Sequence, residues 1–144
     1  MNEVGAAAKF IRATLAENEA VAALVGARIY ELEAPDRATY PLLVFSHAGG
    51  PDRLTSGTSR LLAQSRWLVL AVVDRRDMVA ARAIASAADN ALVGSTGNVT
   101  LDGDEQEYHV QTIRREEPVE RGGRVDSKYY SRAGGFYRAP THSL

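Results

Sequence analysis

The stretch that decides the fold is Ser59-Arg-Leu-Leu-Ala-Gln-Ser-Arg-Trp-Leu-Val-Leu-Ala-Val-Val-Asp74, which is followed by a helical pattern from Asp77 to Val93. Its second half, Trp67 to Val73, is an unbroken apolar run rich in β-branched and aromatic residues. Such a run, without Gly or Pro, predicts a strand that is buried on both faces. Because polar residues interrupt the first half, one long strand is expected to run from a solvent-exposed end into a buried one.

Alternation of side chains along this strand gives it two apolar faces. The even-numbered positions form one face and the odd-numbered positions the other: Leu68, Leu70 and Val72 against Trp67, Val69, Ala71 and Val73. If helices cover only one face, the second needs another cover. That cover is either the domain's own hairpin or a partner subunit.

Apolar residues at helical spacing predict a helix over residues 3–17, which Asn2 can cap, and a second, shorter helix over residues 19–25. The segment from Asp77 to Val93 has the same spacing, with a stripe made mostly of alanine. Small side chains let a helix lie close to a sheet. Asp74 or Asp77 is the expected N-cap of this third helix.

Strands are expected at residues 28–30, 41–47, 98–101, 107–115 and 128–138. The segment from Pro41 to Val73 is interpreted as one large hairpin whose loop has about ten residues. Glu116-Glu117-Pro118 is expected to end regular pairing, and Arg121 to Arg124 to form a charged turn. Gly134-Gly135 predicts a bulge or a close backbone approach in the last strand.

This element order predicts the α+β class, with a mostly antiparallel sheet and two helices, the N-terminal one and the one after Asp77, on one face. The 144 residues fit a single domain, expected over residues 1–138, with residues 139–144 as a flexible C-terminal tail. The formal net charge of −1 gives no global attraction to nucleic acid or membrane. The lack of cysteine, of a signal peptide and of a long apolar run favours a soluble, cytosolic product.

No group of residues predicts catalysis or the binding of a cofactor or metal. The histidines, His47, His109 and His142, lack a second ligand at metal-binding spacing. The acidic run from Asp102 to Glu107 lacks the glycine and the distant glutamate of a calcium loop. Basic residues between Arg114 and Arg124 are balanced by glutamates, which does not indicate a nucleic-acid surface. An interface function therefore remains.

Four segments carry a resemblance to a known family: Val21-Ala-Ala-Leu-Val-Gly-Ala-Arg-Ile-Tyr30, Tyr40-Pro-Leu-Leu-Val-Phe45, Trp67 to Val73 running into an alanine-rich helix, and Lys128-Tyr-Tyr-Ser-Arg-Ala-Gly-Gly-Phe-Tyr-Arg138. In order and spacing, the chain resembles the small tail-completion or tail-terminator proteins of long-tailed bacteriophages and of related gene-transfer particles. It departs from them at Val73, where an aromatic residue is frequent, and at Gly134-Gly135.

The resemblance implies a structural virion protein that forms a hexameric ring, ends the tail tube and joins it to the head-side connector protein. It implies no enzymatic activity, cofactor or membrane, and DNA that passes through the lumen without sequence-specific binding. The protein would be found in the tail or neck of the virion, and in the host cytoplasm during assembly. Two alternatives remain open, a head–neck adaptor protein and a small cytosolic binding module.

The resemblance brings no catalytic residues, so only candidate interface positions are named: Gly49, Gly50, Arg53, Trp67, Asp102, Asp104, Arg121 and Arg124. Residues 49–58 and 121–124 are expected to project from the sheet and to contact neighbouring subunits or the tube. Both segments would be mobile in the free subunit and ordered in the assembly. The acidic and basic turns are unlike patches, as a head-to-tail ring requires.

Overall fold

The computed structural model describes residues 2–54 and 60–144. Within these residues the chain forms helices and strands in the following order: α1 (Glu3–Glu17), α2 (Glu19–Val25), β1 (Ile29–Glu31), β2 (Leu42–His47), β3 (Asp52–Leu54), β4 (Arg60–Val73), α3 (Met78–Leu92), β5 (Gly97–Thr100), β6 (Glu107–Val110), β7 (Arg114–Val125) and β8 (Lys128–Ser143). The predicted α+β class is confirmed.

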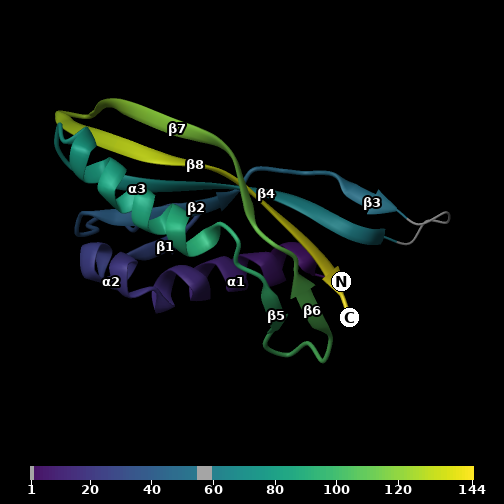
Figure 1. Cartoon of the computed structure of the whole chain (residues 1–144). Helices are drawn as coiled ribbons and strands as arrows, with labels where there is room; N and C mark the ends of the chain where they lie inside the picture. The colour runs from purple at the N-terminus through teal and green to yellow at the C-terminus, as the bar shows by residue number, and fades with distance from the viewer. Residues whose placement is uncertain (1, 55–59) are drawn as a thin grey trace.

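Two long strands, β4 and β8, form the centre of the sheet and pair antiparallel from Ala63–Thr141 to Val73–Ser131 (Figure 1). The strand order is β1-β2-β4-β8-β6-β5, with β3 also paired to β4 and β7 also paired to β8. Each long strand therefore has two successive partners along its other edge: β4 pairs with β3 and then β2, and β8 pairs with β7 and then β6. The β1–β2 pair is parallel.

The helices begin where the sequence predicted. Asn2 caps α1 by accepting from the Gly5 amide, and Asn18 caps α2 by accepting from the Val21 amide. Asp77, one of the two expected caps, accepts from the Ala80 amide at the start of α3. These bonds satisfy backbone donors that a helix cannot satisfy internally.

The hydrophobic core takes side chains from all three helices and from the odd-numbered face of β4, where Trp67 and Val69 are almost fully buried. Leu68 and Leu70, on the even-numbered face, are half-buried and lie outside this core. We call the sheet surface that carries Leu68, Leu70 and their cross-strand neighbours the outer face. The second apolar face predicted from the sequence is therefore covered only in part within this chain.

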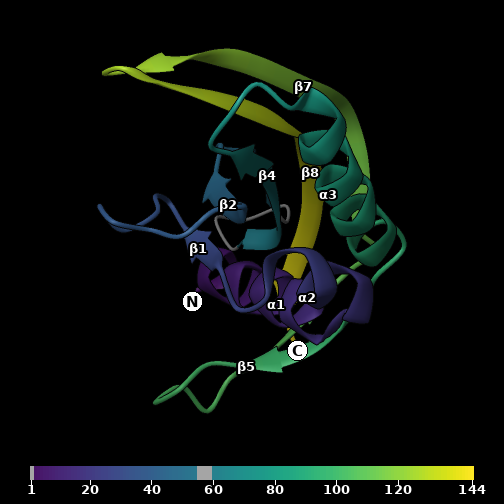
Figure 2. The ribbon, with the colours of Figure 1, turned by 90° about the vertical axis from the view of Figure 1, so that its left-hand side faces the viewer.

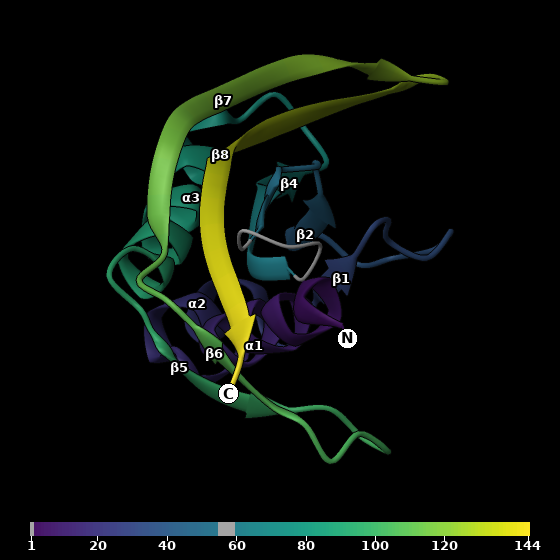
Figure 3. The same ribbon diagram turned by 90° about the vertical axis from the view of Figure 1, so that its right-hand side faces the viewer.

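The sheet is strongly curled (Figures 2 and 3). The far ends of β7 and β8 and the turn between them, residues 121–132, extend beyond the other strands, and we call them the arm. The β5–β6 hairpin lies at the opposite end of the molecule in all three ribbon views. The two projections therefore lie far enough apart to contact different neighbours.

Two predictions about β7 need correction. Glu116-Glu117-Pro118 was expected to end regular pairing: a register shift does lie between Arg115 and Glu117, but pairing resumes after it and β7 continues to Val125. A proline is tolerated here because β7 lies at the edge of the sheet. Residues 121–124 are not a turn: they pair with β8, and the turn is at Asp126 and Ser127. These paired residues are not expected to be mobile in the free subunit.

The prediction of a flexible C-terminal tail over residues 139–144 is also wrong. β8 continues to Ser143, and both Ala139 and Thr141 have no exposed surface. This segment is held because β4 pairs with one edge of it and β6 with the other. Part of the expected loop of the first hairpin is strand β3, while residues 55–58 of that loop lie outside the described residues.

Candidate assembly interface

The outer face carries a row of three arginines that the strand register brings together. Arg66 of β4 pairs with Arg138 of β8, which in turn pairs with Arg114 of β7. Two glutamates at the register shift of β7 neutralise part of this charge. Glu116 accepts from both Arg66 and Arg138 at 3.1 Å, and Glu117 accepts from Arg66 at 2.6 Å.

The electrostatics of this cluster favour the ionised form of Glu116. Burial raises the pKa of Glu116, but hydrogen bonds and charge from Arg138 and Arg66 outweigh burial and lower the pKa below its ordinary value. The Arg66 guanidinium also lies 3.8 Å from the centroid of the Phe136 ring, a cation–π contact. The ion pairs of Glu116 and Glu117 therefore link β4, β7 and β8, although the buried Arg138 Nε has no hydrogen-bond partner among the described residues.

Two further arginines on the outer face form no ion pair with a glutamate or aspartate of the described residues. Arg121 of β7 and Arg132 of β8 are directly opposite each other in the ladder. Like charges at opposite positions destabilise a strand pair. Within residues 2–54 and 60–144 no ion pair joins either guanidinium to a carboxylate. The central carbon of the Arg132 guanidinium lies over the Tyr130 ring, 5.6 Å from its centroid. This pair leaves unbalanced positive charge on the arm.

An apolar groove of about 330 Å³ lies beside this arginine pair. Its floor includes Leu70 and Val72 of β4 and Val44 of β2, and the arm contributes Val125 and Arg132 to its wall. Glu33, from the loop before β2, also lines the groove, which thus combines apolar surface from the outer face with a cationic edge from the arm and one carboxylate.

Aromatic and ionic contacts fix the arm beside this groove. The Tyr40 and Tyr130 rings are 5.5 Å apart, and Lys128 forms an ion pair with Asp74 at 3.2 Å. Burial and the neighbouring Tyr130 raise the pKa of Tyr40, so its hydroxyl stays neutral at physiological pH. The arm therefore contacts both the loop before β2 and the loop before α3.

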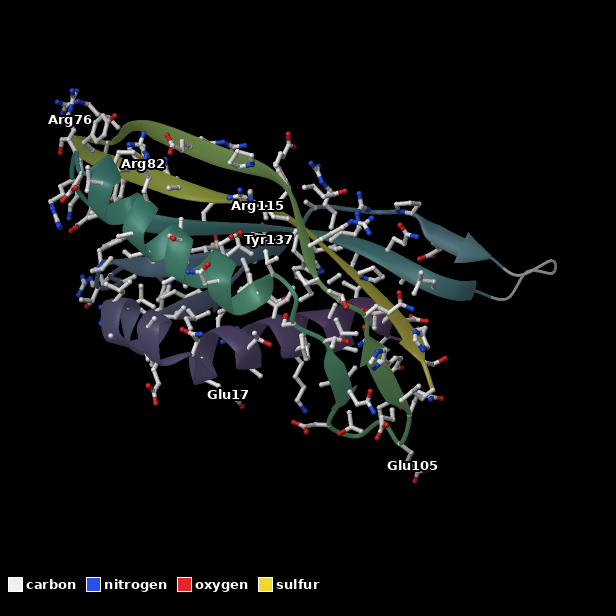
Figure 4. All side chains as sticks on the ribbon, in the orientation of Figure 1. Glu17, Arg76, Arg82, Glu105, Arg115 and Tyr137 are labelled. Atoms are coloured by element: carbon white, nitrogen blue, oxygen red, sulfur yellow. The ribbon has the colours of Figure 1, made fainter. Side chains whose placement is uncertain are left out.

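On its other side, the base of the arm is bound to α3 (Figure 4). Arg82 donates two hydrogen bonds to Glu120, at 2.6 and 3.0 Å, and the Tyr137 hydroxyl donates to Asp89 at 2.7 Å. Burial, followed by the hydrogen bond to Asp89, strongly raises the pKa of Tyr137. Arg115 Nε lies 3.7 Å from Asp89 Oδ1, and both residues line a small pocket of about 180 Å³. These contacts join β7 and β8 to α3 next to the arm.

The β5–β6 connection is acidic, and we call residues 101–107 the acidic turn. Asp104 accepts from the Gln106 amide and from the Tyr108 hydroxyl, both at 2.9 Å, and these bonds lower the pKa of Asp104. Asp102 is exposed and lies 3.8 Å from Lys9. Glu105 points away from the body of the hairpin (Figure 4). The turn is therefore internally ordered and presents Asp102 and Glu105 to solvent.

The structure separates the other candidate positions. Gly49 and Gly50 lie between β2 and β3, where a Cβ on Gly50 would overlap the Gln64 carbonyl, so Gly50 is required by a close approach within the chain. Arg53 lies in β3, and its side chain is outside the described part of the structure. The prediction of Trp67 as an interface residue is wrong, because its side chain is fully buried in the core.

Arg121 and Arg124, predicted as one patch, do not share a face. Successive strand residues alternate, and Arg121 pairs with Arg132 while Arg124 pairs with Tyr129. Arg124 donates to the Ser127 carbonyl in the turn. Sequence reasoning missed Arg132, and the available signal was its position on the same face as Phe136 and Arg138 in an alternating strand.

Among the described residues, no group of three or more His, Cys, Asp or Glu side chains is arranged to hold a metal ion. None of the helices in the described ranges is both long and apolar enough to cross a membrane.

Comparison with known proteins gives a consistent assignment. The family model described as "Tail completion protein gp17" matches residues 9–121. No curated protein matches the chain. A solved structure, "Virion of native gene transfer agent (GTA) particle", contains a chain of similar fold, with a TM-score of 0.59 and 18% sequence identity. The similarity covers 91% of this chain and 90% of that one. The match over residues 9–121 shows that the chain belongs to the tail completion protein gp17 family, a family of structural tail proteins.

Proposed function

We propose that this protein forms a hexameric ring that terminates the tail tube of a phage-like particle and joins the tube to the head-side connector protein. Membership of the tail completion family is the observation that carries this proposal. The similar fold of a chain in a gene transfer agent virion is consistent with it. In this role the protein is a component of the virion tail after assembly in the host cytoplasm, and it is not an enzyme.

The surface of the subunit supports head-to-tail association. A closed ring needs two different patches, one of which meets the other on the next copy. The arm and the acidic turn differ in charge and lie at opposite ends of the molecule (Figures 2 and 3). A net charge of −1 leaves little overall repulsion between copies.

The division of the sheet into two faces supports the same role. The helices α1 and α3 contribute to the core with the odd-numbered face of β4, and we infer that they cover one face of the sheet together. The outer face, with half-buried Leu68 and Leu70, is then available for assembly. DNA passes through the ring without sequence-specific contacts, and the tube and connector proteins bind its two ends.

Particle assembly with and without this protein tests the proposal. Without it, tubes of irregular or excessive length that do not join to heads are expected, and the purified protein should restore tails of normal length. Tubes of normal length that lack heads would instead indicate the alternative role of head–neck adaptor. Particles indistinguishable from the wild type would contradict both roles and leave the cytosolic binding module.

A further inference from the structure

The outer face of the arm has a charge that nothing described in this chain balances. Arg121 and Arg132 are cross-strand neighbours, and their guanidinium groups have no carboxylate partner in residues 2–54 and 60–144. Arg66 and Arg138 differ from this pair, because Glu116 forms an ion pair with each of them and Glu117 forms a second one with Arg66. A repulsive pair of this kind is stabilised when an anionic partner binds to it.

The surroundings of the pair restrict the kind of partner. The groove beside Arg132 is lined by Leu70, Val72 and Val125, and Glu33 is also part of its lining. Its occupant must therefore offer apolar atoms to the floor and direct its carboxylates to the arginines of the arm, away from Glu33. A fully hydrated small anion would leave the apolar floor uncovered. A short protein segment that carries both kinds of group satisfies both parts of the site.

The acidic turn of this same chain has the required chemistry. Asp102 and Glu105 are exposed, and Leu101 precedes them with part of its surface accessible. Within the described residues, Asp102 pairs with Lys9 across a long distance of 3.8 Å between Oδ1 and Nζ, and the Asp102 side chain is highly exposed. Two exposed carboxylates can therefore match the two arginines of the arm.

Geometry excludes an intramolecular contact between these two sites. The arm and the acidic turn lie at opposite ends of the subunit in every ribbon view (Figures 1, 2 and 3). The acidic turn that reaches the arm must therefore belong to another copy.

We infer that Arg121, Arg132 and the adjacent groove of one subunit bind the acidic turn, residues 101–107, of a second copy of the chain. This inference rests on the proposed ring and specifies its subunit contact: the arm of each copy covers the turn of the next. The contact is heterologous, so its repetition can close a ring.

Disulfide trapping tests the contact directly, because the chain contains no cysteine. The variant Val125→Cys/Glu105→Cys keeps both arginines and places one thiol at the groove and one on the turn. Under mild oxidation it should give a ladder of covalent oligomers on a denaturing gel. The matched control Arg124→Cys/Glu105→Cys moves the first thiol by one residue to the opposite face of the arm and should remain monomeric. No ladder from the first variant, or equal ladders from both, would overturn the inference.

Charge reversal provides a second test that does not depend on trapping. Arg121→Glu/Arg132→Glu and, separately, Asp102→Lys/Glu105→Lys should each raise the concentration needed for half-assembly at least tenfold. The variant that combines all four changes should recover most of the wild-type assembly. Normal assembly of either double variant, or failure of the combined variant while it remains folded by circular dichroism, would contradict the assigned pairing.

The failure of this inference can be distinguished from failure of the proposed function. If wild-type rings form but the cysteine pair gives no ladder, the ring stands and the contact is wrong. If the wild type forms no ring at any concentration or in particles, the proposed function fails and this inference fails with it.

Discussion

Gly134 of β8 lies so close to the Val69 carbonyl oxygen of β4 that a Cβ atom at Gly134 would overlap it. The two residues are near neighbours in the central strand pair, where Leu70 is opposite Gly134. The close backbone approach predicted from Gly134-Gly135 is thus confirmed. The sheet is strongly curled along β7 and β8 (Figure 3).

Replacement of this glycine should destabilise the fold. Gly134→Ala forces the backbone of β4 and β8 apart, and overpacking of this kind costs about 1–3 kcal/mol. Chemical denaturation measures the loss. Gly123→Ala is the matched control, because no atom lies within 4 Å of its added Cβ and the residue is also in a strand of the same hairpin. Equal stability of the two variants would contradict the close approach.

Two buried hydrogen bonds through Ser65 link Trp67 to the end of β8 and should contribute to stability. Trp67 Nε1 donates to Ser65 Oγ at 2.9 Å, and Ser65 Oγ donates to the Ala139 carbonyl at 3.0 Å. Ser65→Ala leaves the buried indole N–H without its partner, at a cost of about 1–3 kcal/mol. Unfolding followed by the fluorescence of this tryptophan should report the loss. Ser86→Ala, at an exposed position of α3, should change stability little. A Ser65→Ala variant as stable as the wild type would show that the hydrogen bonds of the Ser65 hydroxyl contribute nothing to stability.

The link between α3 and β8 should contribute to stability through one hydroxyl. Tyr137→Phe removes the hydrogen bond to Asp89 and keeps the buried ring, so a loss of about 1–2 kcal/mol is expected. Tyr30→Phe is the control, because the Tyr30 hydroxyl makes no hydrogen bond with the other described residues. If thermal denaturation gives the same midpoint for wild type and Tyr137→Phe, the hydroxyl has no role in holding the arm.

Glu116 should make stability depend on pH. Because its pKa is lower in the folded state than its ordinary value of 4.5, its contribution is fully present above that value and is lost as the pH falls through the folded pKa. Glu116→Gln should therefore be less stable than wild type at neutral pH, and the difference should shrink in acid. Glu17→Gln, at an exposed position of α1, should follow the wild-type curve. A difference that grows in acid would contradict the assigned ion pairs.

The helices and the central strand were predictable because their signals are local. Asn2, Asn18 and Asp77 cap helices whose apolar spacing is regular, and Trp67 to Val73 has strand character along its whole length. The errors occurred where long-range pairing overrides local chemistry. Glycines, prolines and charges around Pro118 and Arg121 indicate a turn in isolation, but β8 supplies a continuous ladder for them.

The candidate interface was predictable only in part, for the same reason. The exposed acidic turn follows from its composition, whereas the pairing of Arg121 with Arg132 depends on the register between two strands. Alternation along the last strand places Arg132 on the same face as Arg138, but only the register shows that Arg132 is opposite another arginine. The choice of Trp67 failed because the odd-numbered face of β4 is the one that packs in the core.

The oligomeric state is the central claim of this account. Individual ion pairs at an exposed interface contribute about 0–1 kcal/mol, so the subunit can be monomeric when dilute and assemble as its concentration rises or when a tube end is present. The most direct measurement is the subunit number in the layer that ends the tail tube, obtained by cryo-electron microscopy of particles together with mass measurement of the purified protein across a wide concentration range. We expect a closed ring of six copies, with the arm of each against the acidic turn of the next. A monomer at every concentration, together with particles whose tube ends without a six-fold layer of this protein, would contradict it.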